Sequence, residues 1–173
     1  MGIKETTFDL LSVRRHIELT CELDRVYLAG SELVFAQFMD LGGHGVVGTG
    51  SLIMPRTAVA MYQAYDSGDR SRACELQSLL FETMPLARDV RVPIALVRAA
   101  FLLALRQGIN VSLEIAPMQA RIKAALARRG VPIRSFTRSP LPPLTSHDDQ
   151  AVRQALECIE RIEGLPQLAS KGS

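Results

Sequence analysis

The stretch Gly2-Ile3-Lys4-Glu5 reads as a short β-strand, and the residues after it decide the fold. From about residue 9 to residue 23, apolar residues recur at steps of three and four, which is the period of an amphipathic helix. A second strand is predicted at residues 25–29 and a third at residues 45–49, with another helical pattern between them. Short strands that alternate with amphipathic helices predict βαβ units and a parallel sheet.

Beyond residue 54 the strand signals stop. Helical patterns follow at residues 56–65, 69–86, 92–107 and 118–129, broken by glycine or proline. Ser146 and Asp149 form a capping-box pattern that predicts the start of a last helix, ending near residue 162. We therefore expect an α/β part over residues 1–54 and an all-helical domain over residues 55–173.

Three parallel strands do not make a finished sheet, because parallel sheets need both faces covered and both edges protected. One interpretation is that further strands belong upstream, and that the chain is a truncated gene or a deliberately cut piece. The other is a compact small α/β domain with a helical cap. The pattern alone leaves both open.

Composition excludes several classes of function. A formal net charge of +2 gives no positive field that would concentrate nucleic acid. The most apolar segment, residues 92–105, contains Pro93 and Arg98 and is too short to span a bilayer. Three scattered cysteines and the lack of a signal-peptide pattern favour a cytoplasmic location. The three histidines lack ligand spacing with a cysteine or carboxylate, so we expect no metal site.

Lys4 stands out chemically in its strand. An ammonium group is costly to bury, so apolar surroundings favour the uncharged amine. That amine can attack a ketone carbonyl and form an imine. The simpler alternative is that Lys4 lies in solvent near a chain terminus, where disorder is common.

Six stretches of sequence, taken in order, carry a resemblance to a known family. They are residues 2–7 (GIKETT), 29–32 (AGSE) and 41–47 (LGGHGVV), then Pro55 with residues 66–69 (DSGD), residues 116–126 (APMQARIKAAL) and residues 141–144 (LPPL). Together they resemble the dihydrodipicolinate synthase / N-acetylneuraminate lyase family of class I aldolases. The first stretch is similar to that family's strand with the Schiff-base lysine.

This resemblance implies a partial TIM (β/α)8 barrel, its last three βα units, followed by a C-terminal all-helical domain. The chain would be the C-terminal half of such an enzyme, with strands six to eight in residues 1–54. Lys4 would form a Schiff base with pyruvate or another 2-keto acid, without a cofactor. Gly30 would line the pocket through its lack of bulk and Val47 through its backbone. Gly48 stands where many members have serine.

The family's proton-relay tyrosine and carboxylate-binding residues precede the lysine, so we expect this chain alone to be inactive. The first functional hypothesis is a pyruvate-dependent lyase resembling dihydrodipicolinate synthase. A parent enzyme that cleaves 2-keto-3-deoxy sugar acids is an alternative, as is a non-catalytic interaction module that uses the apolar helix at 92–107. As partners we expect a 2-keto acid and either further copies of the chain or a missing N-terminal half.

Overall fold

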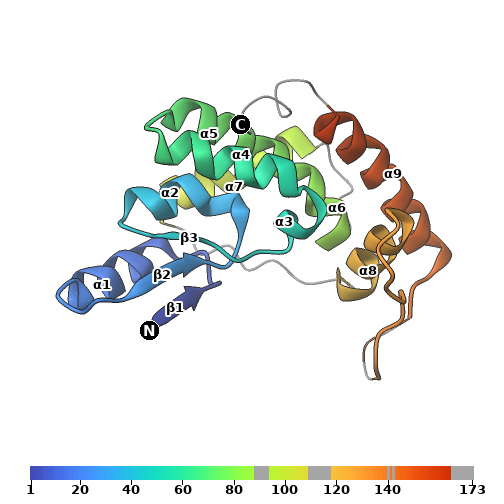
Figure 1. Cartoon of the computed structure of the whole chain (residues 1–173), viewed down its shortest axis with the longest axis horizontal. Helices are drawn as coiled ribbons and strands as arrows, with labels where there is room; N and C mark the ends of the chain where they lie inside the picture. Colours follow the sequence, from blue (N-terminus) through green and yellow to red (C-terminus); the bar gives the residue numbers. More distant parts are fainter. Residues whose placement is uncertain (88–93, 109–117, 140, 142, 165–173) are drawn as a thin grey trace.

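A computed structural model describes residues 1–87, 94–108, 118–139, 141 and 143–164 (Figure 1). The first part alternates strands and helices: β1 (Gly2–Glu5), α1 (Leu10–Thr20), β2 (Val26–Ala29), the 3₁₀ turn η1 (Glu32–Val34), α2 (Phe35–Asp40), β3 (Gly45–Val46) and α3 (Gly50–Ile53). The described residues after it are helical or irregular: α4 (Pro55–Asp66), α5 (Arg70–Leu79), the 3₁₀ turn η2 (Leu80–Thr83), α6 (Met84–Ala87), α7 (Ile94–Arg106), α8 (Met118–Arg128) and α9 (Ser146–Glu163).

The three strands form one parallel sheet in the order β1-β2-β3. Along β1 and β2, Lys4 lies opposite Leu28 and Glu5 lies opposite Ala29. β3 is a shorter strand than predicted, and its Gly45 lies opposite Leu28. The prediction of βαβ units and a parallel sheet is confirmed.

Helices cover one face of this sheet. Tyr27 and Ala29 are 5% and 0% exposed, and the Tyr27 hydroxyl lies 3.5 Å from the carbonyl oxygen of His16 on α1. Because side chains alternate along a strand, Val26 and Leu28 project from the opposite face. Val26 is 43% exposed there. Within the described residues, one face of the sheet is therefore buried at β2 but exposed at Ile3 of β1, which is 45% exposed, and the other face is open at Val26.

The buried core continues from the sheet into the helices. Phe35 and Phe38 on α2 share one hydrophobic cluster with Leu76 on α5 and Ile159 on α9, and all four side chains are at most 2% exposed. Burying each such side chain is worth roughly 1.5–3 kcal/mol. Figure 1 shows the strands at one side of the molecule and α8 and α9 at the other. The division into domains at residue 54 stays a prediction.

Local sequence signals explain most of the helix ends. Gly42 follows α2 with φ +96°, so the predicted end of that helix at the glycine pair is confirmed. The helix predicted at residues 69–86 is instead broken by η2 and restarts as α6. Pro85 lies in the first turn of α6, and it lacks the N–H that a continuous helix would need at that position.

The predicted capping box is wrong by one residue. Thr145, and not Ser146, is the N-cap of α9: its hydroxyl accepts a hydrogen bond from the Asp148 N–H at 3.2 Å. The Asp148 carboxylate in turn accepts one from the Thr145 N–H at 2.8 Å. With Thr145 as the N-cap, Asp148 stands three residues later, where a capping box requires its acidic residue. The Asp148 carboxylate also has a buried partner.

That partner is Arg121 on α8. Arg121 and Asp148 are 1% and 4% exposed, and Nε of Arg121 donates to the carboxylate at 2.7 Å. Arg121 also donates to the carbonyl oxygen of Pro85 at 2.9 Å, so one side chain joins α6, α8 and α9. Burial alone would raise the pKa of Asp148, but hydrogen bonds from Thr145 and Arg121 outweigh it and lower the pKa to about 2.

A second buried carboxylate joins α9 to α4. Glu163 is 5% exposed and accepts hydrogen bonds from the Thr57 N–H at 2.9 Å and the Thr57 hydroxyl at 2.6 Å. The Arg56 N–H donates to it at 3.3 Å. Glu163 therefore satisfies the free N–H groups at the start of α4, which opens with Pro55 and has no cap of its own.

No helix in the described part of the chain is long and apolar enough to cross a membrane.

The Asp148 pKa predicts how stability depends on pH. Its pKa is lowered on folding, so its contribution is present above the unfolded value near 4 and is lost as the pH falls toward 2. We expect Asp148→Asn to lower the free energy of unfolding by about 2–3 kcal/mol at pH 7, measured by urea titration. The difference from wild type should shrink between pH 4 and pH 2.

Asp149→Asn is the matched control, since Asp149 follows Asp148 on α9 but forms only surface ion pairs, with Arg128 and Arg153. It should change stability far less at every pH. If Asp148→Asn and Asp149→Asn lowered the free energy of unfolding equally, the buried Arg121–Asp148 ion pair would not be what stabilises the contact between α8 and α9.

Candidate functional site

Lys4 lies in the second half of β1, directly opposite Leu28 on β2. Paired residues of neighbouring strands project from the same face, so Lys4 lies on the face opposite Tyr27 and Ala29. Its side chain is exposed. We expected apolar surroundings for Lys4, and the structure of this chain does not provide them. The reason is that β1 is an edge strand of the described sheet, where Ile3 on the other face is exposed as well.

The other two predicted site residues directly follow the neighbouring strands, Gly30 after β2 and Val47 after β3. Gly30 lies two residues after Leu28, and Val47 lies two residues after Gly45, the partner of Leu28. Val47 is 49% exposed. Lys4, Gly30 and Val47 thus lie at the carboxyl ends of three neighbouring parallel strands, where parallel α/β folds place their chemistry.

Backbone hydrogen bonds hold these strand ends together beyond the regular sheet. The Gly30 N–H donates to the carbonyl oxygen of Glu5 at 2.6 Å, and the Val47 N–H donates to that of Ala29 at 2.8 Å. A Cβ at Gly30 would lie 2.8 Å from the Glu5 carbonyl oxygen and 2.9 Å from Cα of Thr6. Glycine is therefore needed where β2 passes the end of β1.

The turn after β1 is held by polar and aromatic contacts. Burial alone would raise the pKa of Glu5, but hydrogen bonds from the Thr7 N–H and hydroxyl keep that pKa below its usual value. Phe8 has φ +60°, a strained conformation for a residue other than glycine. Its ring packs edge-on against Phe101 of α7 at a centroid distance of 5.7 Å. The apolar helix predicted at 92–107 therefore packs on its own chain through Phe101.

Glu32 is a site residue that sequence reasoning missed. It is 3% exposed, and its carboxylate accepts hydrogen bonds from the N–H groups of Gly50 at 3.2 Å and Ser51 at 2.7 Å. Its side chain thereby joins the end of β2 to the turn after β3. The sequence signal was the pair Gly48 and Gly50, which leaves room for a side chain from elsewhere.

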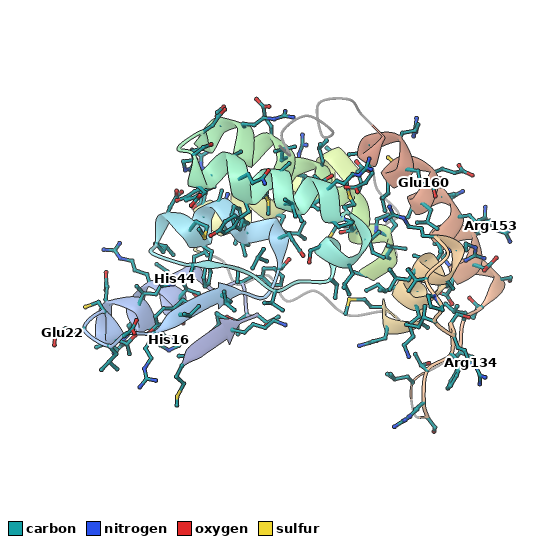
Figure 2. The ribbon with its side chains drawn as sticks, viewed as in Figure 1. His16, Glu22, His44, Arg134, Arg153 and Glu160 are labelled. Atoms are coloured by element: carbon teal, nitrogen blue, oxygen red, sulfur yellow. The ribbon has the colours of Figure 1, made fainter. Side chains whose placement is uncertain are left out.

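The histidines of the described residues do not form a common site with the labelled arginines. His44 lies beside the sheet, where Nδ1 accepts the Tyr27 N–H at 3.1 Å, and Figure 2 shows it apart from Arg134 and Arg153. No group of three or more histidine, cysteine, aspartate or glutamate side chains in the described ranges could hold a metal ion.

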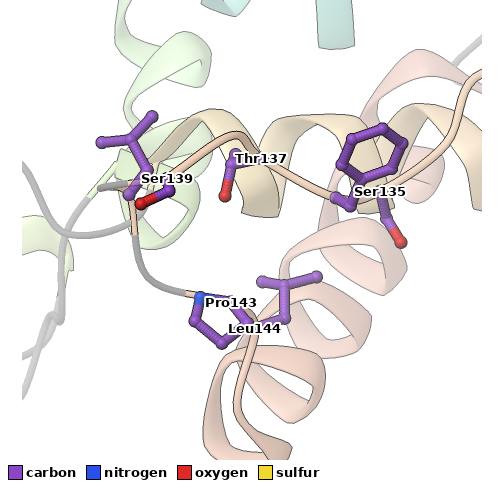
Figure 3. Close-up of a pocket in the computed structure, with 7 residues that line it drawn as sticks. Ser135, Thr137, Ser139, Pro143 and Leu144 are labelled. Atoms are coloured by element: carbon purple, nitrogen blue, oxygen red, sulfur yellow. The ribbon is translucent and has the colours of Figure 1, made fainter.

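A surface hollow lies on the segment between α8 and α9 (Figure 3). It is lined by Ser135, Phe136, Thr137, Ser139, Leu141, Pro143 and Leu144. These side chains supply hydroxyl and apolar groups but no amine or acid that could act as a nucleophile or base. We therefore place the candidate site at the strand ends and not in this hollow.

The family model for the "Dihydrodipicolinate synthetase family" matches residues 1–108. An uncharacterized DapA-like lyase of Halobacterium salinarum is 35% identical over 161 residues, which are 90% of this chain and 40% of that protein. The 4-hydroxy-tetrahydrodipicolinate synthase of Methanospirillum hungatei is 32% identical over 134 residues, 74% of this chain and 45% of that enzyme. The chain thus spans less than half the length of these relatives.

Solved structures agree with the fold. Dihydrodipicolinate synthase from Bacteroides thetaiotaomicron matches with a TM-score of 0.66 and 18% identity, over 91% of this chain and 46% of that one. YagE, a prophage protein of the dihydrodipicolinic acid synthase family from E. coli K12, in complex with pyruvate, matches with a TM-score of 0.61 and 16% identity, over 92% and 46%. The three parallel strands and their helices are a portion of a TIM-barrel fold.

The contact at Gly30 predicts a measurable effect. In Gly30→Ala the new methyl group meets the backbone of Glu5 and Thr6, so β1 must shift relative to β2. We expect the free energy of unfolding to fall by about 1–3 kcal/mol. Chemical denaturation monitored by circular dichroism measures it.

Gly45→Ala makes the same substitution in β3, where the nearest atom, Cδ2 of Leu28, lies at 3.5 Å. That is an ordinary contact, so the loss should be smaller. If Gly45→Ala destabilised the protein as much as Gly30→Ala, the close approach at Gly30 would not be the cause.

Proposed function

We propose that this chain, which belongs to the dihydrodipicolinate synthetase family, supplies the Schiff-base lysine of a pyruvate-type class I aldolase. The observation that supports this proposal is the position of Lys4 near the carboxyl end of β1, with Gly30 and Val47 directly after the two neighbouring parallel strands. We further propose that the chain corresponds to the C-terminal half of such an enzyme, with its strands at barrel positions six to eight.

The proposed reaction begins when the uncharged Lys4 amine attacks the keto carbon of pyruvate or another 2-keto acid. Loss of water gives an imine, and loss of a proton from the neighbouring carbon gives an enamine. The enamine then adds to an aldehyde, and the reverse sequence cleaves the carbon–carbon bond. The protonated imine accepts the electron pair of the bond that breaks, and this makes these steps feasible at neutral pH.

Lys4 is exposed in this chain, so the proposed reaction needs a partner that covers the open face. An apolar cover would favour the uncharged amine and exclude water. We propose that a polypeptide corresponding to the unmatched part of the family provides this cover, in the cytoplasm, where the free thiols of Cys21, Cys74 and Cys158 persist. Which aldehyde or sugar acid reacts is set by residues outside this chain.

A non-catalytic interaction module is the second candidate. The observation that favours it is the exposure of Leu96 and Leu103 on α7, at 61% and 57%, although Phe101 of the same helix is buried. Exposed leucines on one helix can bind a partner without any chemistry at Lys4.

Borohydride trapping separates the two candidates. The chain is mixed with a polypeptide comprising the part of the Halobacterium salinarum relative that it does not match, then with pyruvate and borohydride. We expect one reduced pyruvyl group on Lys4, located by peptide mass spectrometry. The chain has only three lysines, so the assignment is direct.

Lys4→Ala should abolish this adduct, whereas Lys123→Ala, which changes a lysine on α8, should leave it intact. Without the added polypeptide we expect little specific labelling. If Lys4 stays unlabelled even in the mixture, the aldolase proposal is wrong and the interaction module is favoured.

The open face also predicts association. Val26 is exposed on that face, and β1 presents an uncovered strand edge, so the chain alone should self-associate in sedimentation experiments. Val26→Lys should weaken self-association, because it places a charge on the face that must be buried. Val59→Lys is the control, since Val59 is 56% exposed on α4.

Adding the complementary polypeptide should convert the self-associated chain into a one-to-one complex. A wild-type chain that stays a monodisperse monomer and unfolds cooperatively without it would contradict the proposed need for cover.

A further inference from the structure

Glu32 is a buried carboxylate that the proposed reaction does not use. It is 3% exposed, in the turn that follows β2, and the hydrogen bonds resolved for it come from the backbone N–H groups of Gly50 and Ser51. Burying a carboxylate costs free energy unless hydrogen bonds replace its hydration. Two backbone donors do so here, and they fix the position of the carboxylate relative to the turn after β3.

Glu32 joins the segment after β2 to the segment after β3. These two segments contain the proposed pocket residues Gly30 and Val47. Glu32 follows Gly30 by two positions, and its donors Gly50 and Ser51 follow Val47 by three and four. The Ser51 hydroxyl donates to the carbonyl oxygen of Gly48 at 3.0 Å, which closes the same turn. The backbone from residue 47 to residue 51 is therefore held against the end of β2.

Gly48 shows how closely this backbone approaches Glu32. A Cβ at Gly48 would overlap the carboxylate, lying 2.6 Å from its Cδ atom. A Cβ at Gly50 would lie 3.2 Å from the same atom. The carboxylate occupies the space where a side chain at position 48 would stand, so the glycine and the glutamate fit as a pair.

We propose that Glu32 is a positioning residue of the keto-acid pocket, which sets the backbone of Val47 and Gly48 relative to Gly30 and Lys4. This inference rests on the proposed function. Glu32 acts through the turn and does not bind the keto acid, because its two oxygens are buried and already accept hydrogen bonds. Displacement of a pocket wall by about 1 Å can reduce productive binding by as much as ~10²-fold.

The test compares Glu32→Gln with Glu163→Gln. Both glutamates are at most 5% exposed and accept backbone N–H groups at a helix start, but Glu163 lies on α9 and caps α4. Glutamine keeps the shape and removes one acceptor oxygen, so either variant loses some stability. Circular dichroism then selects a temperature at which both variants and the wild type are folded.

The readout is the rate of borohydride-trapped adduct at Lys4 as a function of pyruvate concentration, with the complementary polypeptide present. For Glu32→Gln we expect the half-saturating pyruvate concentration to rise about tenfold while the maximal rate stays within about twofold, because Lys4 itself is unchanged. Glu163→Gln should leave both values unchanged. Gly48→Ala, which displaces the Glu32 carboxylate, should give the same result as Glu32→Gln. It replaces Glu32→Gln in the comparison if Glu32→Gln does not fold.

If Glu32→Gln and Gly48→Ala trap pyruvate as the wild type does, Glu32 only stabilises the turn and the inference is wrong. An equal rise in Glu163→Gln would overturn it as well, since general destabilisation would then explain the change. Absence of any adduct in the wild type is a different result, because it refutes the proposed function and removes this inference with it.

Discussion

A parallel sheet is stable only when both of its faces are covered, and this constraint governs the rest of the molecule. α1 and the core behind it bury the face with Tyr27 and Ala29. The opposite face carries Lys4 and exposes Val26 and Val47. The open face is therefore the structural reason why a residue proposed to act in apolar surroundings is exposed in this chain.

Buried carboxylates organise the described structure at three separate places. Glu32 joins the strand ends, Asp148 joins α8 to α9 through Arg121, and Glu163 holds the start of α4. Each accepts hydrogen bonds from backbone N–H groups, at a helix start or a turn, where the free N–H groups of the chain favour an anion. These contacts connect segments that local sequence patterns treat as independent.

Sequence patterns predicted the structural features that depend on residues close together in the sequence. The limits of β1, the order of strands and helices and the end of α2 at Gly42 all follow from periodicity and glycine chemistry. The predicted functional residues Lys4 and Val47 came from a family resemblance, and the parallel strand order places them at the same edge of the sheet. The role of Glu32 was missed, because its burial depends on residues 18 and 19 positions further along the chain and the glycines there were not connected to it. The sequence left both a buried and an exposed Lys4 open, because its exposure depends on the position of β1 at the edge of the described sheet.

The hydrogen bond between Glu163 and Thr57 has a consequence for how the protein is made. The two residues are 106 positions apart, so the start of α4 stays without its acceptor until residue 163 has left the ribosome. Closing so long a loop carries an entropic cost that must be met before the contact stabilises anything. During synthesis α4 is therefore exposed without its contact to α9, and chaperones have time to bind it.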